Sequence, residues 1–71
     1  MTDIQMLKEE FKDSGMTMTA IAEKSGIKRE TLYNRLKGLS EFSASEIVAL
    51  TEVLHLSKEK RDKIFLSGKL N

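Results

Sequence analysis

Four polar or charged side chains, Arg29, Glu30, Tyr33 and Asn34, follow one another at positions i, i+1, i+4 and i+5. If this segment is an α-helix, its period of about 3.6 residues gathers all four along one side. An arginine on such a side can pair with guanine, and an asparagine with adenine, in the major groove of DNA. The spacing therefore predicts a helix that reads base edges, provided that other elements hold its opposite side.

The composition argues against other kinds of chemistry. The chain of 71 residues has one histidine and no cysteine, so it can build neither a disulfide framework nor a usual zinc site. It contains no glycine-rich phosphate loop and no pair of nucleophile and base. A helical domain of this size also lacks room for an ordinary substrate pocket. We expect no catalytic residue, no metal, no cofactor and no small-molecule substrate.

Positive charge is concentrated in two segments. The formal net charge is only +1, yet residues 23–37 and residues 57–71 each contain five basic and two acidic side chains. Such a local excess favours a polyanionic partner. No run approaches the roughly 18 apolar residues of a membrane span, and the N-terminal segment lacks an export pattern. We therefore expect a soluble, cytoplasmic protein that makes no membrane contact.

Helix signals at the start of the chain predict two helices before the polar segment. Thr2 and Gln5 can form a capping box for the first helix, and Gly15 can end it in a left-handed conformation. Thr17 is the candidate N-cap of a short second helix that ends near Lys24.

Three further helices complete the predicted fold. The third extends from residue 28 or 29 to residue 37, and Gly38 follows it. Ser43 and Glu46 form the capping box of the fourth helix. That helix is expected to be largely buried, because its apolar residues are Ile47, Val48, Leu50, Val53 and Leu54. The fifth begins at Ser57 and ends at Gly68, and His55 caps or shapes the corner before it. Strand signals are absent, so the fold class is all-α.

The second and third helices fit a helix-turn-helix. Ser25, Gly26 and Ile27 join them, and the tight turn needs a residue that tolerates positive φ. Ala22 is small where the two helices cross, while Ile21, Ile27 and Leu32 point toward a shared core. This arrangement leaves the polar side of the third helix free.

The segment from Thr17 to Gly38 resembles the helix-turn-helix of the Cro and C-repressor-like (XRE-type) family. Taking Met18 as the first position of the family's motif, the expected residues are all present: Ile21, Ala22, Gly26, Ile27 and Leu32. The resemblance covers nearly the whole chain. It implies one compact, five-helix, lambda-repressor-like DNA-binding domain over residues 1–71, with the helix-turn-helix at about 17–37. The sequence DKIFLSG near the end is similar to small regulators of bacteriophages and prophages.

The resemblance also implies roles for individual residues. Arg29, Glu30 and Asn34 match positions that reach base edges, and Tyr33 can touch a thymine methyl group or a phosphate. The positions that match phosphate contacts are Thr17, Thr19, Lys28 and Lys37. Four residues depart from the family pattern. Met18 replaces a common glutamine, Lys28 replaces a frequent Ser or Thr, and Ser25 and Arg35 each stand where an apolar residue is usual.

The fifth helix carries three consecutive apolar residues, Ile64, Phe65 and Leu66. A helix packed on one side cannot bury all three, and we expect them to form a dimer or partner interface. In the alternative, Ile64 and Phe65 belong to the core and only Leu66 is exposed.

The resemblance favours a Cro-like phage repressor in a lysis–lysogeny switch. It would bind double-stranded operator DNA as a homodimer, in the cytoplasm of a bacterial host, without the extra domain of a cleavable repressor. The alternative is an antirepressor or modulator that binds a partner phage repressor. The near-neutral total charge and the acidic side chain of Glu30 on the reading side favour this second possibility.

Overall fold

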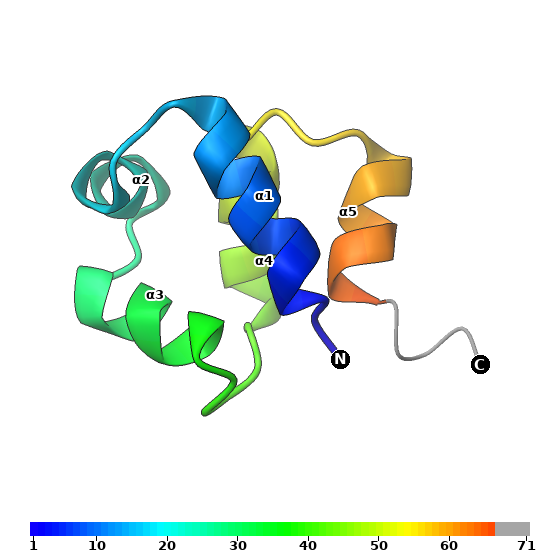
Figure 1. The fold of residues 1–71 in the computed structure, drawn as a ribbon, viewed down its shortest axis with the longest axis horizontal. Helices are drawn as coiled ribbons and strands as arrows, with labels where there is room; N and C mark the ends of the chain where they lie inside the picture. The colour runs from blue at the N-terminus through cyan, green and yellow to red at the C-terminus, as the bar shows by residue number, and fades with distance from the viewer. Residues whose placement is uncertain (67–71) are drawn as a thin grey trace.

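The computed structural model describes residues 1–66, and Figure 1 shows the arrangement of its helices. The helices are α1 (Ile4–Ser14), α2 (Met18–Ser25), α3 (Arg29–Leu36), α4 (Ala44–Val53) and α5 (Lys58–Phe65). No strand occurs among these residues. The predicted all-α fold with five helices is confirmed. The predicted end of the fifth helix, Gly68, lies outside the described residues.

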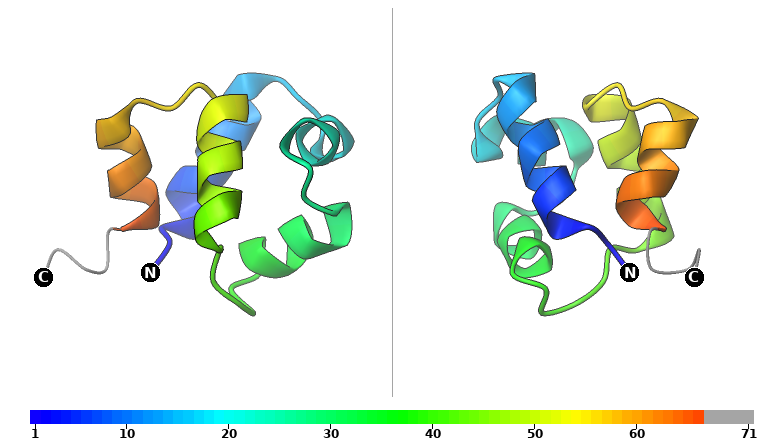
Figure 2. Two further views of the ribbon diagram at one scale, coloured as in Figure 1. Left: turned by 180° about the vertical axis from the view of Figure 1, so that it is seen from behind. Right: turned by 45° about the vertical axis from the view of Figure 1, so that its right-hand side comes forward.

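The helices pack into a small bundle, with α2 and α3 at one end and α5 at the other (Figures 1 and 2). The axis of α3 lies across that of α2, which is seen end-on in Figure 1. The start of the chain lies beside the end of α5, where the Asp3 N–H donates to the Ile64 carbonyl at 2.6 Å. The two ends of the described chain are therefore tied together.

Each helix contributes one fully buried side chain to a single core. These five residues are Leu7, Ile21, Leu32, Leu50 and Ile64. Five more apolar side chains complete the buried set: Phe11, Ala22, Ile27, Phe42 and Phe65. Burial of a Leu, Ile or Phe side chain contributes about 1.5–3 kcal/mol relative to exposure. This shared core fixes the angle at which every helix meets its neighbours.

Most predicted helix starts are confirmed, and one is wrong. The side chains of Thr17, Ser43 and Ser57 cap α2, α4 and α5, and Ser43 forms the expected capping box with Glu46. The first helix is capped by Asp3 instead of Thr2, because the Asp3 carboxylate accepts from the Met6 N–H at 3.0 Å.

The hydroxyl group of Thr2 makes a different contact. It donates to the carboxylate of Glu41 at 3.4 Å. Glu41 belongs to the segment between α3 and α4. The predicted capping box of Thr2 and Gln5 therefore does not form, and the first helix begins at Ile4.

The fourth helix is less buried than its composition predicts. Leu50 is fully buried, but Val48 is 58% exposed and Val53 is half-buried. The apolar residues of α4 occur on more sides of the helix than its neighbours cover. Val48 therefore contributes apolar surface to the outside of the bundle.

His55 shapes the corner between α4 and α5, as predicted. Its φ of 54° is in the left-handed region, where a glycine is more usual. The His55 N–H donates to the Glu52 carbonyl at 3.3 Å, and the Leu56 N–H donates to the Thr51 carbonyl at 2.9 Å. These two bonds form a Schellman motif that ends α4.

Candidate nucleic-acid interface

The turn between α2 and α3 is built on Gly26, whose φ is 76°. Its N–H donates to the Ala22 carbonyl at 2.9 Å, which ends α2. The Ser25 hydroxyl accepts from the Ile27 N–H at 3.3 Å and donates to the Ala22 carbonyl at the same distance. The Ser25 hydroxyl thus forms hydrogen bonds with two backbone groups of the turn, which an apolar side chain at this position could not do. After this turn the chain continues through Lys28 into α3, which begins at Arg29.

The turn places one side of α3 in the core and the other side outside. Leu32 is fully buried, whereas Tyr33, the next residue, is 42% exposed. Arg29 and Glu30 are exposed, and Asn34 is half-buried. The structure therefore gathers the four predicted base-reading residues on the outer part of α3, with Asn34 the least accessible.

Arg29 is connected to two other residues of the motif. Its Nη1 donates to Thr19 Oγ1, in the first turn of α2, at 3.1 Å. The Arg29 Cζ atom also lies 5.9 Å from the centre of the Tyr33 ring, one turn further along α3, within the range of a cation–π contact. The guanidinium group is consequently positioned by both helices of the motif.

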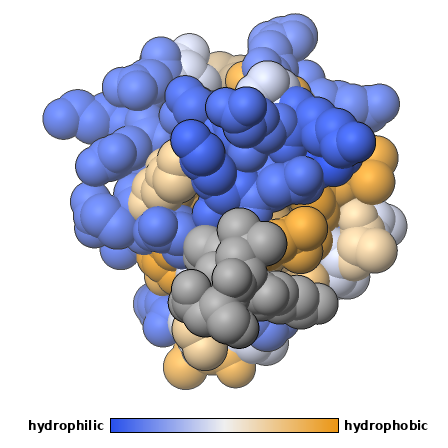
Figure 3. Space-filling view, turned by 90° about the vertical axis from the view of Figure 1, so that its right-hand side faces the viewer, coloured by the Kyte–Doolittle hydropathy of each residue, from blue (hydrophilic) through white to orange (hydrophobic). Residues whose placement is uncertain are grey.

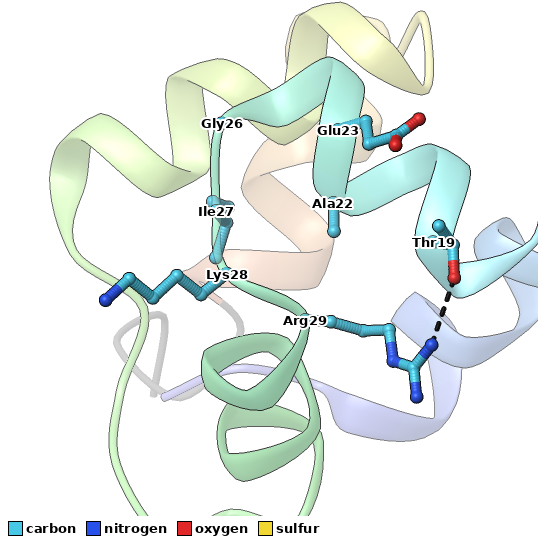
Figure 4. A pocket seen from close by; sticks show the side chains of 7 residues that line it. All are labelled: Thr19, Ala22, Glu23, Gly26, Ile27, Lys28 and Arg29. Carbon is cyan, nitrogen blue, oxygen red and sulfur yellow. Dashed lines mark hydrogen bonds between the residues drawn. The ribbon is translucent and has the colours of Figure 1, made fainter.

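A groove of about 500 Å³ lies where α2, the turn and the start of α3 meet (Figure 4). Its lining residues are Thr19, Ala22, Glu23, Gly26, Ile27, Lys28 and Arg29. Figure 4 shows Lys28 and Arg29 extending in different directions from the start of α3, with the Arg29 side chain toward Thr19. Two cationic groups and one carboxylate, that of Glu23, thus border the junction of the two helices.

The predicted phosphate-contacting residues lie at exposed positions of the same motif. Thr17, Thr19, Lys28 and Lys37 are all exposed. The Thr17 hydroxyl accepts from the Ala20 N–H at 3.1 Å, which leaves its own hydrogen available to a ligand. Lys28 precedes α3 and Lys37 ends it. Within residues 1–66, neither lysine forms an ion pair with a carboxylate.

Arg35 behaves differently from the other cations of residues 23–37. Its Nε and Nη2 donate to the two carboxylate oxygens of Glu46 at 3.0 and 3.2 Å, and its Nη1 bonds to Ser40. The side chains of Arg35 and Glu46 are only 21% and 16% exposed. Arg35 therefore joins α3 to α4, and its charge is compensated within the protein.

The Glu46 carboxylate is stabilised in its ionised form. Partial burial acts to raise its pKa, but the hydrogen bonds from Arg35 and from the Ser43 N–H, together with the Arg35 charge, lower the pKa below its ordinary value of 4.5. The same carboxylate also completes the capping box of α4. The sequence indicated the capping box, since Ser43 and Glu46 are three residues apart, but not the pairing with Arg35 across the 38–42 segment.

The predicted interface of Ile64, Phe65 and Leu66 requires a correction. Ile64 and Phe65 are buried within the chain, where the Phe65 ring meets that of Phe42 edge-on at 5.6 Å. Leu66 is 37% exposed. Both buried residues find partners because α5 contacts α1 on one side and the segment before α4 on another. Of the three, Leu66 is the most exposed.

Exposed apolar surface does occur between α4 and α5. A groove of about 230 Å³ is lined by Ala44, Ile47, Val48, Arg61, Asp62, Phe65 and Leu66. Figure 3 views the molecule from the α5 side and shows hydrophobic surface bordered by hydrophilic side chains. In this groove, Arg61 Nη2 and Asp62 Oδ1 are 2.9 Å apart. One charged group of each sign thus lies beside apolar side chains.

Residues 1–66 contain neither a metal-ligand cluster nor a membrane-spanning helix. No group of three or more His, Cys, Asp or Glu residues could hold a metal ion there. None of the helices is long and apolar enough to cross a membrane.

Comparison with known protein families agrees with this geometry. A helix-turn-helix family model of the XRE type matches residues 7–60 of the chain. The chain belongs to the XRE-type helix-turn-helix family. Members of this family are DNA-binding regulators, and the chain is accordingly a DNA-binding transcription regulator of the XRE type. No similar curated protein and no similar solved structure was found.

The XRE-type match includes all of the elements that position the outer side of α3. Residues 7–60 contain α2, the turn, α3 and α4 in full. The Thr19–Arg29 hydrogen bond and the Arg35–Glu46 ion pair both lie within it. The family assignment therefore rests on the same part of the molecule as the candidate interface.

Proposed function

We propose that this protein is a Cro-like repressor of a bacteriophage or prophage and that it binds operator DNA through α3. The observation that carries the proposal is the division of α3 between a buried Leu32 and an exposed outer side with Arg29, Glu30 and Tyr33. A helix held in this way can enter the major groove and present its first residues to base edges.

The side chains suit two kinds of DNA contact. Arg29 and Asn34 have the hydrogen-bonding groups to pair with guanine and adenine, Glu30 can accept from a cytosine amino group, and Tyr33 can touch a thymine methyl group. In addition, four residues can bind phosphates and so set the position of the domain on the duplex. They are Thr17, Thr19, Lys28 and Lys37. Only the first group would determine the sequence that is bound.

A homodimer is the second part of the proposal. Binding to two half-sites about one helical turn apart requires a two-fold contact between copies. Val48, Leu66 and the groove between α4 and α5 offer exposed apolar surface for that contact. Because Arg61 and Asp62 both border this groove, a two-fold axis can place each beside the opposite charge of the other copy.

One alternative function has support from a specific observation. The Arg35 charge is paired with Glu46, and Glu30 adds a negative charge to the exposed side of α3. Both features reduce the positive potential that non-specific DNA binding requires. They favour an antirepressor or modulator that uses the same surface, or the groove between α4 and α5, to bind a partner repressor.

DNA binding can be tested by titrating the protein onto duplexes from the region around its own gene, with scrambled duplexes as a reference, at two salt concentrations. We expect preferential, salt-sensitive binding to one duplex. Arg29→Ala and Asn34→Ala should each cost about 1–3 kcal/mol on that duplex and relax base preference at one position. The exposed Lys58 of α5 offers a matched control, because Lys58→Ala removes a cation away from α3.

Two outcomes would contradict the proposal. Unchanged base preference in both α3 variants would show that this side of α3 does not read DNA. An absence of preference for any duplex, with affinity insensitive to salt, would favour the partner-binding alternative.

A further inference from the structure

The hydrogen bond between Thr19 and Arg29 connects the two helices of the motif at their exposed surface. The residues are ten positions apart, and both side chains are exposed. We propose that Thr19 is a positioning residue for base recognition: it holds the guanidinium group of Arg29 in the orientation that reads guanine. This inference rests on the proposed function, because it requires that α3 enters the major groove.

The bond uses one side of the guanidinium group and leaves another available. Arginine has five N–H donors in a planar group, and Nη1 supplies the one that Thr19 accepts. Within residues 1–66, neither Nε nor Nη2 of Arg29 has a hydrogen-bond partner. These two nitrogens form an edge with parallel donors, which matches the O6 and N7 acceptors of guanine. Thr19 therefore restrains Arg29 without occupying the edge that would read the base.

Tyr33 restrains the same group from a second direction. The Arg29 Cζ atom is 5.9 Å from the centre of the Tyr33 ring, and Figure 4 shows the Arg29 side chain extended toward Thr19. An unrestrained arginine loses much rotamer freedom when it binds a base. With two contacts already made in the free protein, part of that loss occurs during folding instead of binding, and the base contact becomes more favourable.

The hydroxyl group of Thr19 retains one further capacity. It accepts from Arg29 through its oxygen, so its hydrogen can still be donated. A phosphate oxygen is a suitable acceptor for that hydrogen. One side chain would then contact the DNA backbone and, through Arg29, fix the position of a base-reading group.

A purely structural role for this bond is disfavoured by its location. The core beneath it is made by other residues of α2, namely Ile21 and Ala22, with Met18 packed against them. Thr19 also makes no capping bond, since Thr17 is the N-cap of α2. Loss of the Thr19 hydroxyl should consequently leave the fold intact while changing the mobility of Arg29.

The test compares Thr19→Val with Thr19→Ser. Valine keeps nearly the same shape without the hydroxyl group, and serine keeps the hydroxyl group. An operator is first selected from random duplexes with the unaltered protein. Affinity is then measured for that operator and for duplexes in which each guanine is replaced in turn. We expect Thr19→Val to reduce discrimination at one guanine by about fivefold to tenfold, and Thr19→Ser to retain it within roughly twofold.

A second pair of variants separates positioning from backbone contact. In an Arg29→Ala background, Thr19→Val should have no further effect on discrimination at that guanine, because the group that it positions is gone. Thermal unfolding of all variants gives the reference for folding, and we expect the midpoint of Thr19→Val to be unchanged.

The possible results are distinct. If Thr19→Val weakens binding to every duplex by one common factor, Thr19 acts on the DNA backbone alone and the inference is overturned. If discrimination at guanine depends on Thr19 even without Arg29, the inference is overturned as well. If the unaltered protein selects no duplex at all, the proposed function fails first, and the inference fails with it.

Discussion

The two ends of α3 are held in opposite ways. At its start, Lys28 is the N-cap residue but makes no side-chain capping bond, and Arg29 is exposed. At its end, Arg35 makes two hydrogen bonds to the Glu46 carboxylate and one to Ser40. A Schellman motif completes this end, where the Gly38 N–H donates to the Arg35 carbonyl at 3.0 Å.

This difference indicates how a short helix can be both fixed and accessible. A helix of 8 residues is not stable when isolated, so its stability must come from tertiary contacts. The contacts made by Leu32 and Arg35 hold the buried side and the far end of α3. The start is left with unused backbone and side-chain donors, which are the groups that a nucleic acid accepts. The polar groups of one end thus stabilise the fold, and those of the other remain available to a ligand.

The largest expected effect comes from removing the anchor beneath α3. Leu32→Ala deletes a fully buried side chain and should lower the free energy of unfolding by about 2–5 kcal/mol. Tyr33→Ala, at the exposed neighbouring position, is the control. Apart from the loss of the contact between Tyr33 and Arg29, this substitution should change the free energy of unfolding by less than about 0.5 kcal/mol. Denaturant unfolding measures both. Similar losses in the two variants would contradict the division of α3 into a buried and an exposed side.

An intermediate effect is expected from the Arg35–Glu46 contact, and it depends on pH. Since the folded pKa of Glu46 lies below its ordinary value of 4.5, its contribution is complete above that value and is lost as pH falls through the folded pKa. Glu46→Gln should therefore reduce the free energy of unfolding by about 1–3 kcal/mol at neutral pH.

Acid titration provides the internal check on this prediction. The difference between Glu46→Gln and the unaltered protein should shrink as pH falls well below 4.5, because both proteins then carry a neutral group at this position. Unfolding curves at several pH values give that difference. If the difference in the free energy of unfolding between the two proteins stays constant with pH, the ion pair does not stabilise the end of α3.

The smallest expected effect comes from capping the open end of α3. Lys28→Ser supplies a side chain that can accept from the free N–H groups of the first turn, and the free energy of unfolding should rise by about 0.5–1 kcal/mol. Lys37→Ser removes the same charge at the other end without creating an N-cap, and no gain is expected there. Thermal unfolding compares the two, and equal shifts would indicate an effect of charge alone.

Local signals in the sequence were sufficient for most of the fold. The N-caps Thr17 and Ser43 and the left-handed residues Gly15 and Gly26 were predicted because capping involves groups within about four residues of one another. The prediction that Leu32 points toward a shared core indicated the buried side of α3. The first helix shows the limit of such signals, since Thr2 and Asp3 are both good N-caps. In the structure Asp3 caps the helix, while the Thr2 hydroxyl bonds to Glu41, a residue distant in sequence.

The sequence by itself determined the five helices, the turn at Gly26 and which residue types lie on the outer side of α3. Only the tertiary structure decided the pairing of Arg35 with Glu46, the contact of Arg29 with Thr19, and the burial of Phe65 against Phe42. The physical reason is that these contacts join separate helices and segments. Their distances depend on how the shared core sets the angles between elements, and no local pattern encodes those angles.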